Sequence, residues 1–170
     1  DKKQQALKNA VLEKATFLQT LEHELFASND SGQFDALKAK LENGAWSELS
    51  SSNNANLEKA LQNRADSLRK TGSIEELKQL AKDCEQQVRS LCIELEIRAN
   101  IDTPEEDQSL RMQIQLDQLK QGFGQAKPDR KENARYAMDT ELQAHCIGPV
   151  EKQTQASLIT RLEQAVKKLL

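Results

Sequence analysis

Residues 74–95 read IEELKQLAKDCEQQVRSLCIEL, and the spacing of their apolar side chains sets the architecture of the chain. Apolar positions recur three and four residues apart over about three heptads, the pattern of a helix that packs against other helices. These positions are Ile74, Leu77, Ala81, Cys84, Val88, Leu91 and Leu95. A second apolar strip, formed by Cys92, Ile93 and Ile97, lies beside this seam and predicts a central helix that several neighbours contact.

Most of the chain repeats this amphipathic pattern, and we expect about seven helices with little or no strand. Clusters of Gly, Pro, Ser and Asn separate the periodic segments, because these residues favour turns. The predicted helices cover about residues 2–27, 33–48, 54–70, 73–100, 103–121, 128–147 and 150–170. The fifth helix is apolar around much of its circumference and is expected to be well buried, at Leu110, Met112, Ile114, Leu116 and Leu119.

Capping sequences indicate where two of these helices start. Residues 73–76 (SIEE) can form a capping box, in which the Ser hydroxyl accepts from a helical amide and the last Glu reaches back. Residues 103–106 (TPEE) combine a cap residue, a Pro and a Glu, and predict the clearest helix start in the chain. Gly44 lies inside the helix predicted over 33–48, where Gly costs up to about 1 kcal/mol relative to Ala, so we expect fraying there.

These segments predict a single all-α domain over residues 1–170. We expect either an antiparallel multi-helix bundle or a short solenoid of helical hairpins. Residues 33–70 would form a hairpin and residues 73–125 a long central helix pair. Residues 128–170 are predicted to repeat the hairpin, because the apolar positions of its first copy recur 101 residues later without a gap. Such units hide their apolar faces by stacking on neighbours.

Composition and charge argue against several classes of protein. Charged residues make up 30% of the chain and aromatic residues only 4%, as in long packed helices. The net charge of −3 argues against wide contact with nucleic acid or with anionic lipid. No apolar run approaches the roughly 18 residues of a membrane span, and the start, DKKQQ, has no hydrophobic signal core. Because the chain starts without Met, we expect a fragment or a processed form.

Three cysteines and two histidines are the candidate metal ligands and nucleophiles. An odd cysteine count in a chain of this length favours reduced thiols in the cytoplasm over a disulfide framework. Cys84, Cys92 and Cys146 lack the paired spacing of a zinc site, so we interpret them as small buried groups. His23 and His145 lack the Glu-x-x-His spacing of a di-iron bundle. We therefore expect no catalytic residue, no metal and no cofactor.

A basic cluster is the one candidate binding site in the sequence. Four cations fall within nine residues around a predicted helix start, where they could meet phosphates: Lys127, Arg130, Lys131 and Arg135. Two carboxylates dilute the cluster, and Tyr136 is the nearby aromatic residue for stacking on a base. An ordinary solvated helix face is the alternative interpretation of this cluster.

Two segments of the chain resemble a known bacterial family. Residues 90–97 (SLCIELEI) and 101–115 (IDTPEEDQSLRMQIQ) resemble a segment of the bacterial domain of unknown function 349 family. In that family's repeated module, a Trp at a helix end is followed by Leu-x-x-Arg-Phe on the next helix. Trp46 fits the Trp position, and residues 158–162 (LITRL) fit the second copy. The chain departs from the family pattern in having Ile147 for a second Trp, Ala60 for the Arg, and Leu61 and Leu162 for the Phe. The resemblance implies a helical region of a larger bacterial cytosolic protein, and it carries over no activity.

The leading hypothesis from the sequence is a non-enzymatic structural or protein-interaction module of a larger bacterial cytosolic protein. It rests on the amphipathic helices, the predicted repeat and the missing set of catalytic residues. A protein partner, or another part of the same chain, would contact such a module. The alternative hypothesis is a nucleic-acid-associated helical module that uses the basic cluster at residues 127–135.

Overall fold

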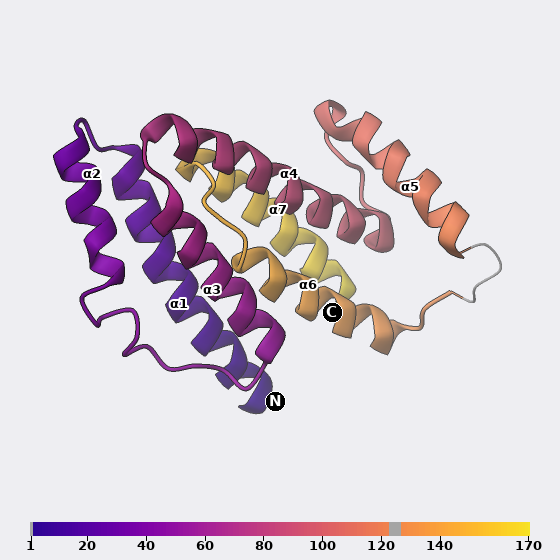
Figure 1. The fold of residues 1–170 in the computed structure, drawn as a ribbon. Helices are drawn as coiled ribbons and strands as arrows, with labels where there is room; N and C mark the ends of the chain where they lie inside the picture. The colour runs from indigo at the N-terminus through magenta and orange to yellow at the C-terminus, as the bar shows by residue number, and fades with distance from the viewer. Residues whose placement is uncertain (1, 123–126) are drawn as a thin grey trace. The chain divides into compact units, whose positions relative to one another are not determined.

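The computed structural model describes residues 2–122 and 127–170, and in these ranges the chain is helical without strands. Seven α-helices and two short 3-10 segments follow one another in the described ranges (Figure 1). They are α1 (Lys2–Phe26), α2 (Ser31–Lys38), η1 (Ala39–Leu41), α3 (Ala55–Lys70), α4 (Ile74–Ala99), η2 (Glu105–Asp107), α5 (Gln108–Gly122), α6 (Arg130–His145) and α7 (Lys152–Leu169). The predicted all-α multi-helix bundle is confirmed. None of these helices combines the length and the apolar character that crossing a membrane requires.

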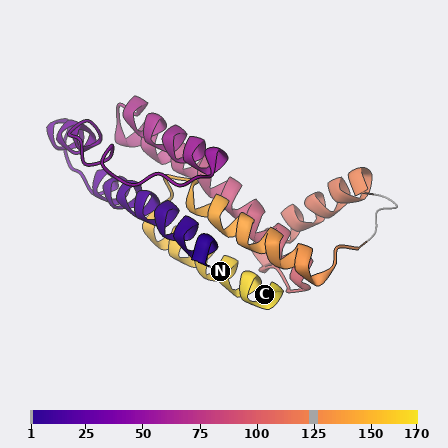
Figure 2. The same cartoon turned by 90° about the horizontal axis from the view of Figure 1, so that it is seen from below.

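The helices group into two compact units. The first unit comprises Asp1–Glu85 and Leu142–Gln155, and the second comprises Gln86–Glu141 and Ala156–Leu170. Because the unit boundaries cut through α4, α6 and α7, each of these helices contributes residues to both units. Within the first unit, α1 lies beside both α2 and α3 (Figures 1 and 2).

Three long helices match their predicted ranges. The helices predicted over 2–27, 54–70 and 73–100 correspond to α1, α3 and α4 to within one residue at each end. The Asn54 side chain caps α3 by accepting a hydrogen bond from the Leu57 amide at 3.1 Å. Local sequence signals were sufficient for these helices, because periodicity and capping act within a few residues.

The ends of α4 show how it starts and stops. The Glu76 amide donates to the Ser73 hydroxyl at 3.2 Å, as the capping box predicts. The Glu76 carboxylate reaches back one residue further than expected and accepts from the Gly72 amide at 2.7 Å. Asn100 follows the last turn with a φ of 54°, a left-handed conformation that Asn tolerates and that ends a helix.

The helix predicted over 33–48 is wrong in its C-terminal part. α2 ends at Lys38, the chain tightens into η1, and residues 42–49 form turns. Gly44 supplies the physical reason, because its φ of 93° lies in the left-handed region and cannot continue a right-handed helix. Trp46 is nevertheless buried, so the apolar pattern of this segment predicted burial correctly and helix incorrectly.

The C-terminal helices are shorter than predicted. The fifth helix begins with η2 and continues as α5 to Gly122. The predicted helix stop at residues 122–124 lies partly outside the described ranges, which omit residues 123–126. α6 begins at Arg130, two residues after the predicted start at Pro128. The two hairpins predicted as copies differ in their connections, since residues 42–54 precede α3 and only residues 146–151 precede α7.

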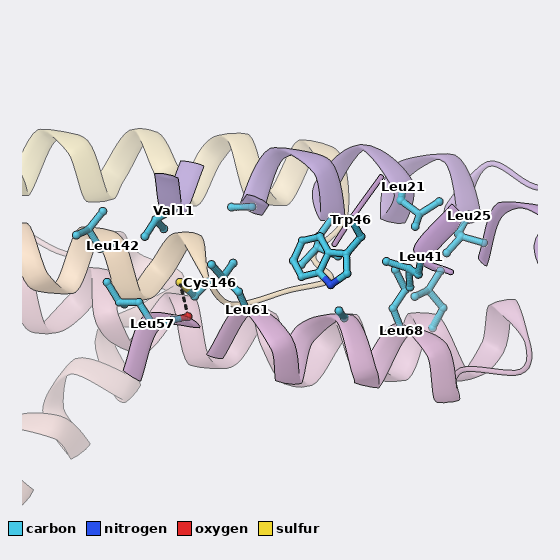
Figure 3. Packing of buried hydrophobic residues seen from close by; sticks show 14 of the residues in the cluster. Val11, Leu21, Leu25, Leu41, Trp46, Leu57, Leu61, Leu68, Leu142 and Cys146 are labelled. Carbon is cyan, nitrogen blue, oxygen red and sulfur yellow. Dashed lines mark hydrogen bonds between the residues drawn. The ribbon is translucent and has the colours of Figure 1, made fainter. Parts of the chain in front are cut away.

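A cluster of buried apolar side chains fills the first unit (Figure 3). It draws on α1, α2, α3, the start of α4 and the end of α6, with Trp46 added from the turn after η1. Five leucines of this cluster are fully buried: Leu18, Leu25, Leu61, Leu68 and Leu77. The Cys146 thiol donates a hydrogen bond to the Leu57 carbonyl inside the cluster at 3.9 Å.

The predicted seam of α4 is buried along most of its length. Its buried members are Leu77, Ala81, Cys84, Val88 and Leu95. Leu91 is only half-buried, whereas Cys92 and Ile93 next to it are fully buried. The buried face of α4 therefore shifts toward the second apolar strip in its C-terminal half.

An ion pair is buried in the first unit. Arg64 on α3 donates from Nε and Nη2 to the two carboxylate oxygens of Glu22 on α1, at 2.9 and 2.6 Å, and from Nη1 to the His145 carbonyl at 2.8 Å. The Arg64 and Glu22 side chains are 2% and 0% exposed. Burial by itself lowers the pKa of Arg64, but the Glu22 carboxylate raises it above its usual value, so the guanidinium stays charged. Gly148 leaves the room this requires, since a Cβ there would lie 2.5 Å from the guanidinium.

We predict that Glu22→Ala destabilises the protein by about 3–5 kcal/mol, because it leaves the Arg64 charge buried without a partner. Replacing both residues, as Glu22→Leu with Arg64→Met, should recover most of that loss, because no charge is then buried. Urea unfolding followed by circular dichroism measures both effects. A double variant as unstable as Glu22→Ala alone would contradict this account of the pair.

Candidate interaction surface

The predicted basic cluster lies at the start of α6. Lys127, Arg130, Lys131 and Arg135 are all exposed. Asp129 caps the helix, because its Oδ1 accepts a hydrogen bond at 2.8 Å from the backbone amide three residues later. The structure therefore brings the four cations together at one end of α6 as a solvated surface that an anionic group can reach.

Tyr136 is not free to serve this cluster as a stacking platform. The guanidinium carbon of Arg98 lies 3.7 Å from the centroid of the Tyr136 ring. The Tyr136 hydroxyl donates to a Glu94 carboxylate oxygen at 3.2 Å. Burial raises the pKa of Tyr136, and the Glu94 carboxylate raises it further. The aromatic contact that the nucleic-acid hypothesis would use is thus occupied by residues of α4.

The candidate nucleophiles are protonated thiols inside the protein. Cys84, Cys92 and Cys146 are 6%, 0% and 3% exposed. Burial raises the pKa of Cys84 and Cys146 to about 11 and that of Cys92 to about 12. At neutral pH such thiols are poor nucleophiles, because the thiolate is the reactive form. In the part of the chain that the structure describes, no three His, Cys, Asp or Glu side chains converge on a metal position.

Among the described residues, two of the hollows lie in the first unit. The larger of these two, of about 540 Å³, is lined by residues 51–54 and by residues of α1: Lys3, Gln4, Ala6, Leu7 and Ala10. The smaller, of about 270 Å³, is lined by His23, Phe26, Lys78, Glu151, Lys152 and Gln153. Its charged side chains are of both signs, so it has no single preference for an anion or a cation.

Charged residues that the sequence analysis did not single out meet inside the second unit. Arg161 on α7 donates to both carboxylate oxygens of Glu96 on α4, at 2.9 and 3.1 Å, and to Asp107 on η2 at 2.7 Å. Arg89 donates to the same Asp107 oxygen at 2.9 Å. The Glu96 and Asp107 side chains are 4% and 7% exposed. We call these four residues the buried ion network; it fixes the turn between α4 and α5 to α4 and to α7.

Thr103 joins this network and does not cap the fifth helix. Its hydroxyl donates to Glu96 at 3.0 Å and accepts from Arg111 of α5 at 2.9 Å. The role of Thr103 as the cap of the helix start predicted at 103–106 is therefore wrong, because its hydroxyl is used in the protein interior. The chain instead passes through η2, and α5 begins at Gln108.

The buried ion network has a structural role and is not an acid–base site. Burial lowers the pKa of Arg161, but the hydrogen bonds that it donates to the Glu96 and Asp107 carboxylates raise its pKa well above the usual value. The guanidinium therefore holds its proton at any physiological pH. Glu96 could have been noticed in the sequence, because it follows Cys92 by one helical turn on the second apolar strip, and a charge on a buried strip indicates a buried partner.

The outer face of α5 departs most from expectation. α5 has no buried residue, so the predicted burial of the fifth helix is wrong. Met112, Leu116 and Leu119 are 65%, 57% and 61% exposed, whereas Leu110 and Ile114 are half-buried. We call Met112, Leu116 and Leu119 the outer stripe. In Figures 1 and 2, α5 lies at the edge of the second unit.

The helical period explains why these apolar residues divide into two groups. At about 100° per residue, the outer stripe spans only about 60° of the α5 surface. Leu110 and Ile114 lie roughly opposite, on the side where Arg111 anchors α5 to the network. α5 is thus apolar on two opposite sides, and the second unit covers one of them.

Comparison with known proteins gives no match to this chain. No protein-family model matches it, and no curated protein and no solved structure matches it either. The structure itself defines the class, an all-α helical bundle. The resemblance to the domain of unknown function 349 family stays a prediction.

We predict that Asp107→Ala loosens α5, because Arg89 and Arg161 lose the carboxylate that they share. Amide hydrogen exchange in α5 should become at least about ten times faster, in line with the loss of a buried charged hydrogen bond. Asp117→Ala is the matched control, since Asp117 is an exposed carboxylate on α5 itself. Equal exchange rates in the two variants would show that the network does not hold α5.

The three thiols also predict how stability depends on pH. Their usual pKa is 9.0 and their folded-state pKa is about 11 to 12, so above pH 9 the unfolded chain loses protons that the folded chain retains. Because the folded state then binds more protons, stability falls as pH rises from 9 toward 11. We expect a steeper fall of the urea midpoint for the natural chain than for the variant Cys84→Ala, Cys92→Ala, Cys146→Ala. Parallel pH profiles would contradict the assignment.

Proposed function

We propose that this chain is a non-enzymatic helical interaction module of a larger bacterial cytosolic protein, and that the outer stripe of α5 is its docking surface. The observation that carries the proposal is the exposure of Met112, Leu116 and Leu119, at 65%, 57% and 61%, on one side of a single helix. Single exposed apolar residues are common on protein surfaces. A contiguous row of them is typical of a surface that another protein covers.

The anchoring of α5 supports this function. Arg111 donates to the Thr103 hydroxyl at 2.9 Å, and Thr103 donates to Glu96, so the start of α5 is tied to the buried ion network. A helix held in this way can present its other side in a fixed orientation. A preorganised surface loses less conformational entropy on binding than a mobile one.

The charged groups of the second unit fit a structural role. Two buried carboxylates there, Glu96 and Asp107, are paired with Arg161 and Arg89 and hold helices together. The resemblance of residues 90–115 to the domain of unknown function 349 family is the reason for proposing that the chain belongs to a larger bacterial protein.

A nucleic-acid-associated role is the second proposal. The exposure of Lys127, Arg130, Lys131 and Arg135 favours it, because a phosphate backbone binds cations that are accessible on a protein surface. The contacts of Tyr136 with Arg98 and Glu94 disfavour it, since they occupy the aromatic ring beside the cluster. We therefore rank it below the protein-interaction function.

We predict that Leu116→Glu abolishes partner capture without unfolding the chain, because the introduced charge lies in the middle of the outer stripe at an exposed position. The measurement is quantitative mass spectrometry of proteins recovered with the tagged chain after cross-linking, and recovery should fall at least about tenfold. Leu170→Glu is the matched control, because Leu170 is 54% exposed outside the stripe. Equal recovery with both variants, each folded by circular dichroism, would overturn the proposed docking surface.

A further inference from the structure

We propose that the occupant of the outer stripe is a second copy of this chain, with the two α5 helices packed antiparallel about a two-fold axis. The proposal rests on the proposed function, because it names the partner of the same surface. Three features of α5 carry it: the spacing of its apolar side chains, the absence of like charges that would face each other across the seam, and the opposite charge of its two ends.

The spacing of the outer stripe is that of a helix-pairing seam. Met112, Leu116 and Leu119 are four and three residues apart, which is the alternation of positions d, a and d in a heptad repeat. The residues beside the stripe are Gln113 and Gln115, both exposed and uncharged, and Lys120 next to its C-terminal end. Two copies of this face can therefore approach each other without like charges meeting along the seam.

The two ends of α5 carry opposite charge. Exposed carboxylates precede it, at Asp102, Glu105 and Glu106. Exposed cations follow from its last turn into the start of α6, at Lys120, Lys127, Arg130 and Lys131. Asp129 and Glu132 lie among them, and this end keeps a net positive charge. In an antiparallel pair, the acidic end of one helix lies beside the basic end of the other, so opposite charges attract at both ends of the pair. In a parallel pair, like charges would meet at both ends, so the charge pattern selects the antiparallel arrangement.

The cations at the start of α6 also favour an anionic neighbour. Arg130 and Lys131 occupy the first turn of α6, where the helix macrodipole presents positive charge. Glu132 in the same turn and Asp129 at the cap offset part of this positive charge within the chain. Carboxylates supplied by a second copy would offset the remainder, in addition to pairing with Lys120.

Symmetry places each residue of the stripe opposite an apolar partner. With the two-fold axis near Leu116, Met112 of one copy packs against Leu119 of the other, and the two Leu116 side chains meet at the axis. This is an isologous interface, in which the same patch is used on both copies and the association closes at two.

The size of the stripe sets the strength of the dimer. Three side chains on one 15-residue helix bury much less than the roughly 800 Å² per partner of a stable complex. We therefore expect a reversible dimer with a dissociation constant on the order of 100 µM.

The test is sedimentation equilibrium of the full 170-residue chain from about 10 µM to 1 mM, a range that brackets the expected dissociation constant. We expect a monomer–dimer equilibrium that Leu116→Glu shifts to monomer and Leu170→Glu leaves unchanged. Glu105→Lys with Glu106→Lys should weaken the dimer. Adding Lys120→Glu, Lys127→Glu, Arg130→Glu and Lys131→Glu to that variant should restore it, because both ends are then reversed in sign and still complementary.

Cysteine cross-linking tests the helix orientation. The three natural thiols are buried, so an introduced surface cysteine is the reactive one. Gln115→Cys, near the axis, should form a disulfide-linked dimer under oxidation. Ser109→Cys should not, because seven residues at 1.5 Å each on either side of the axis separate the two positions by about 20 Å, beyond disulfide reach.

The outcomes separate this inference from the proposed function. A chain that stays monomeric at 1 mM overturns the self-pairing; if partner capture still depends on Leu116, the interaction function stands with a different partner. Cross-linking through Ser109→Cys in place of Gln115→Cys overturns the antiparallel arrangement. A monomeric chain whose partner capture is insensitive to Leu116→Glu overturns both.

Discussion

Hydrogen-bonded pairing between buried guanidinium and carboxylate groups is the constraint on which each unit of this chain depends. Arg64 and Glu22 join α3 to α1 in the first unit, and both side chains are almost fully buried. Arg161 with Glu96 and Asp107 joins α7 to α4 and to the turn before α5 in the second. A buried charge that loses its partner costs several kcal/mol, so each group forces the helices that carry it into one relative register.

The pairing of Arg161 with Glu96 and Asp107 also determines which side of α5 is exposed. Asp107 and Thr103 come from the turn between α4 and α5, and their contacts with Arg161 and Glu96 bring the start of α5 to the second unit. The anchoring acts on one side of α5 only. On the opposite side, Met112, Leu116 and Leu119 stay in contact with water and form an exposed apolar surface.

Two expectations failed for different reasons. The helix predicted over 33–48 had an adequate apolar pattern, but Gly44 adopts a φ of 93°, so a local backbone conformation ends the regular helix before the buried Trp46. Residues 103–106 match the capping-box pattern, but the Thr103 hydroxyl donates to Glu96. There a contact with another helix outweighed a local capping preference, which is worth only about 1 kcal/mol.

The sequence by itself determined the helical class, the bounds of α1, α3 and α4, and the cap of α3 at Asn54, because periodicity and capping depend on residues within one or two turns. It also located the exposed cations from Lys127 to Arg135, since charged side chains of this density remain in solvent. Only the tertiary structure decided which charges are buried together and which apolar side of α5 is left uncovered. Those outcomes depend on residues far apart in the chain, such as Glu22 with Arg64 and Glu96 with Arg161, and a helical period cannot tell which neighbour will cover a face.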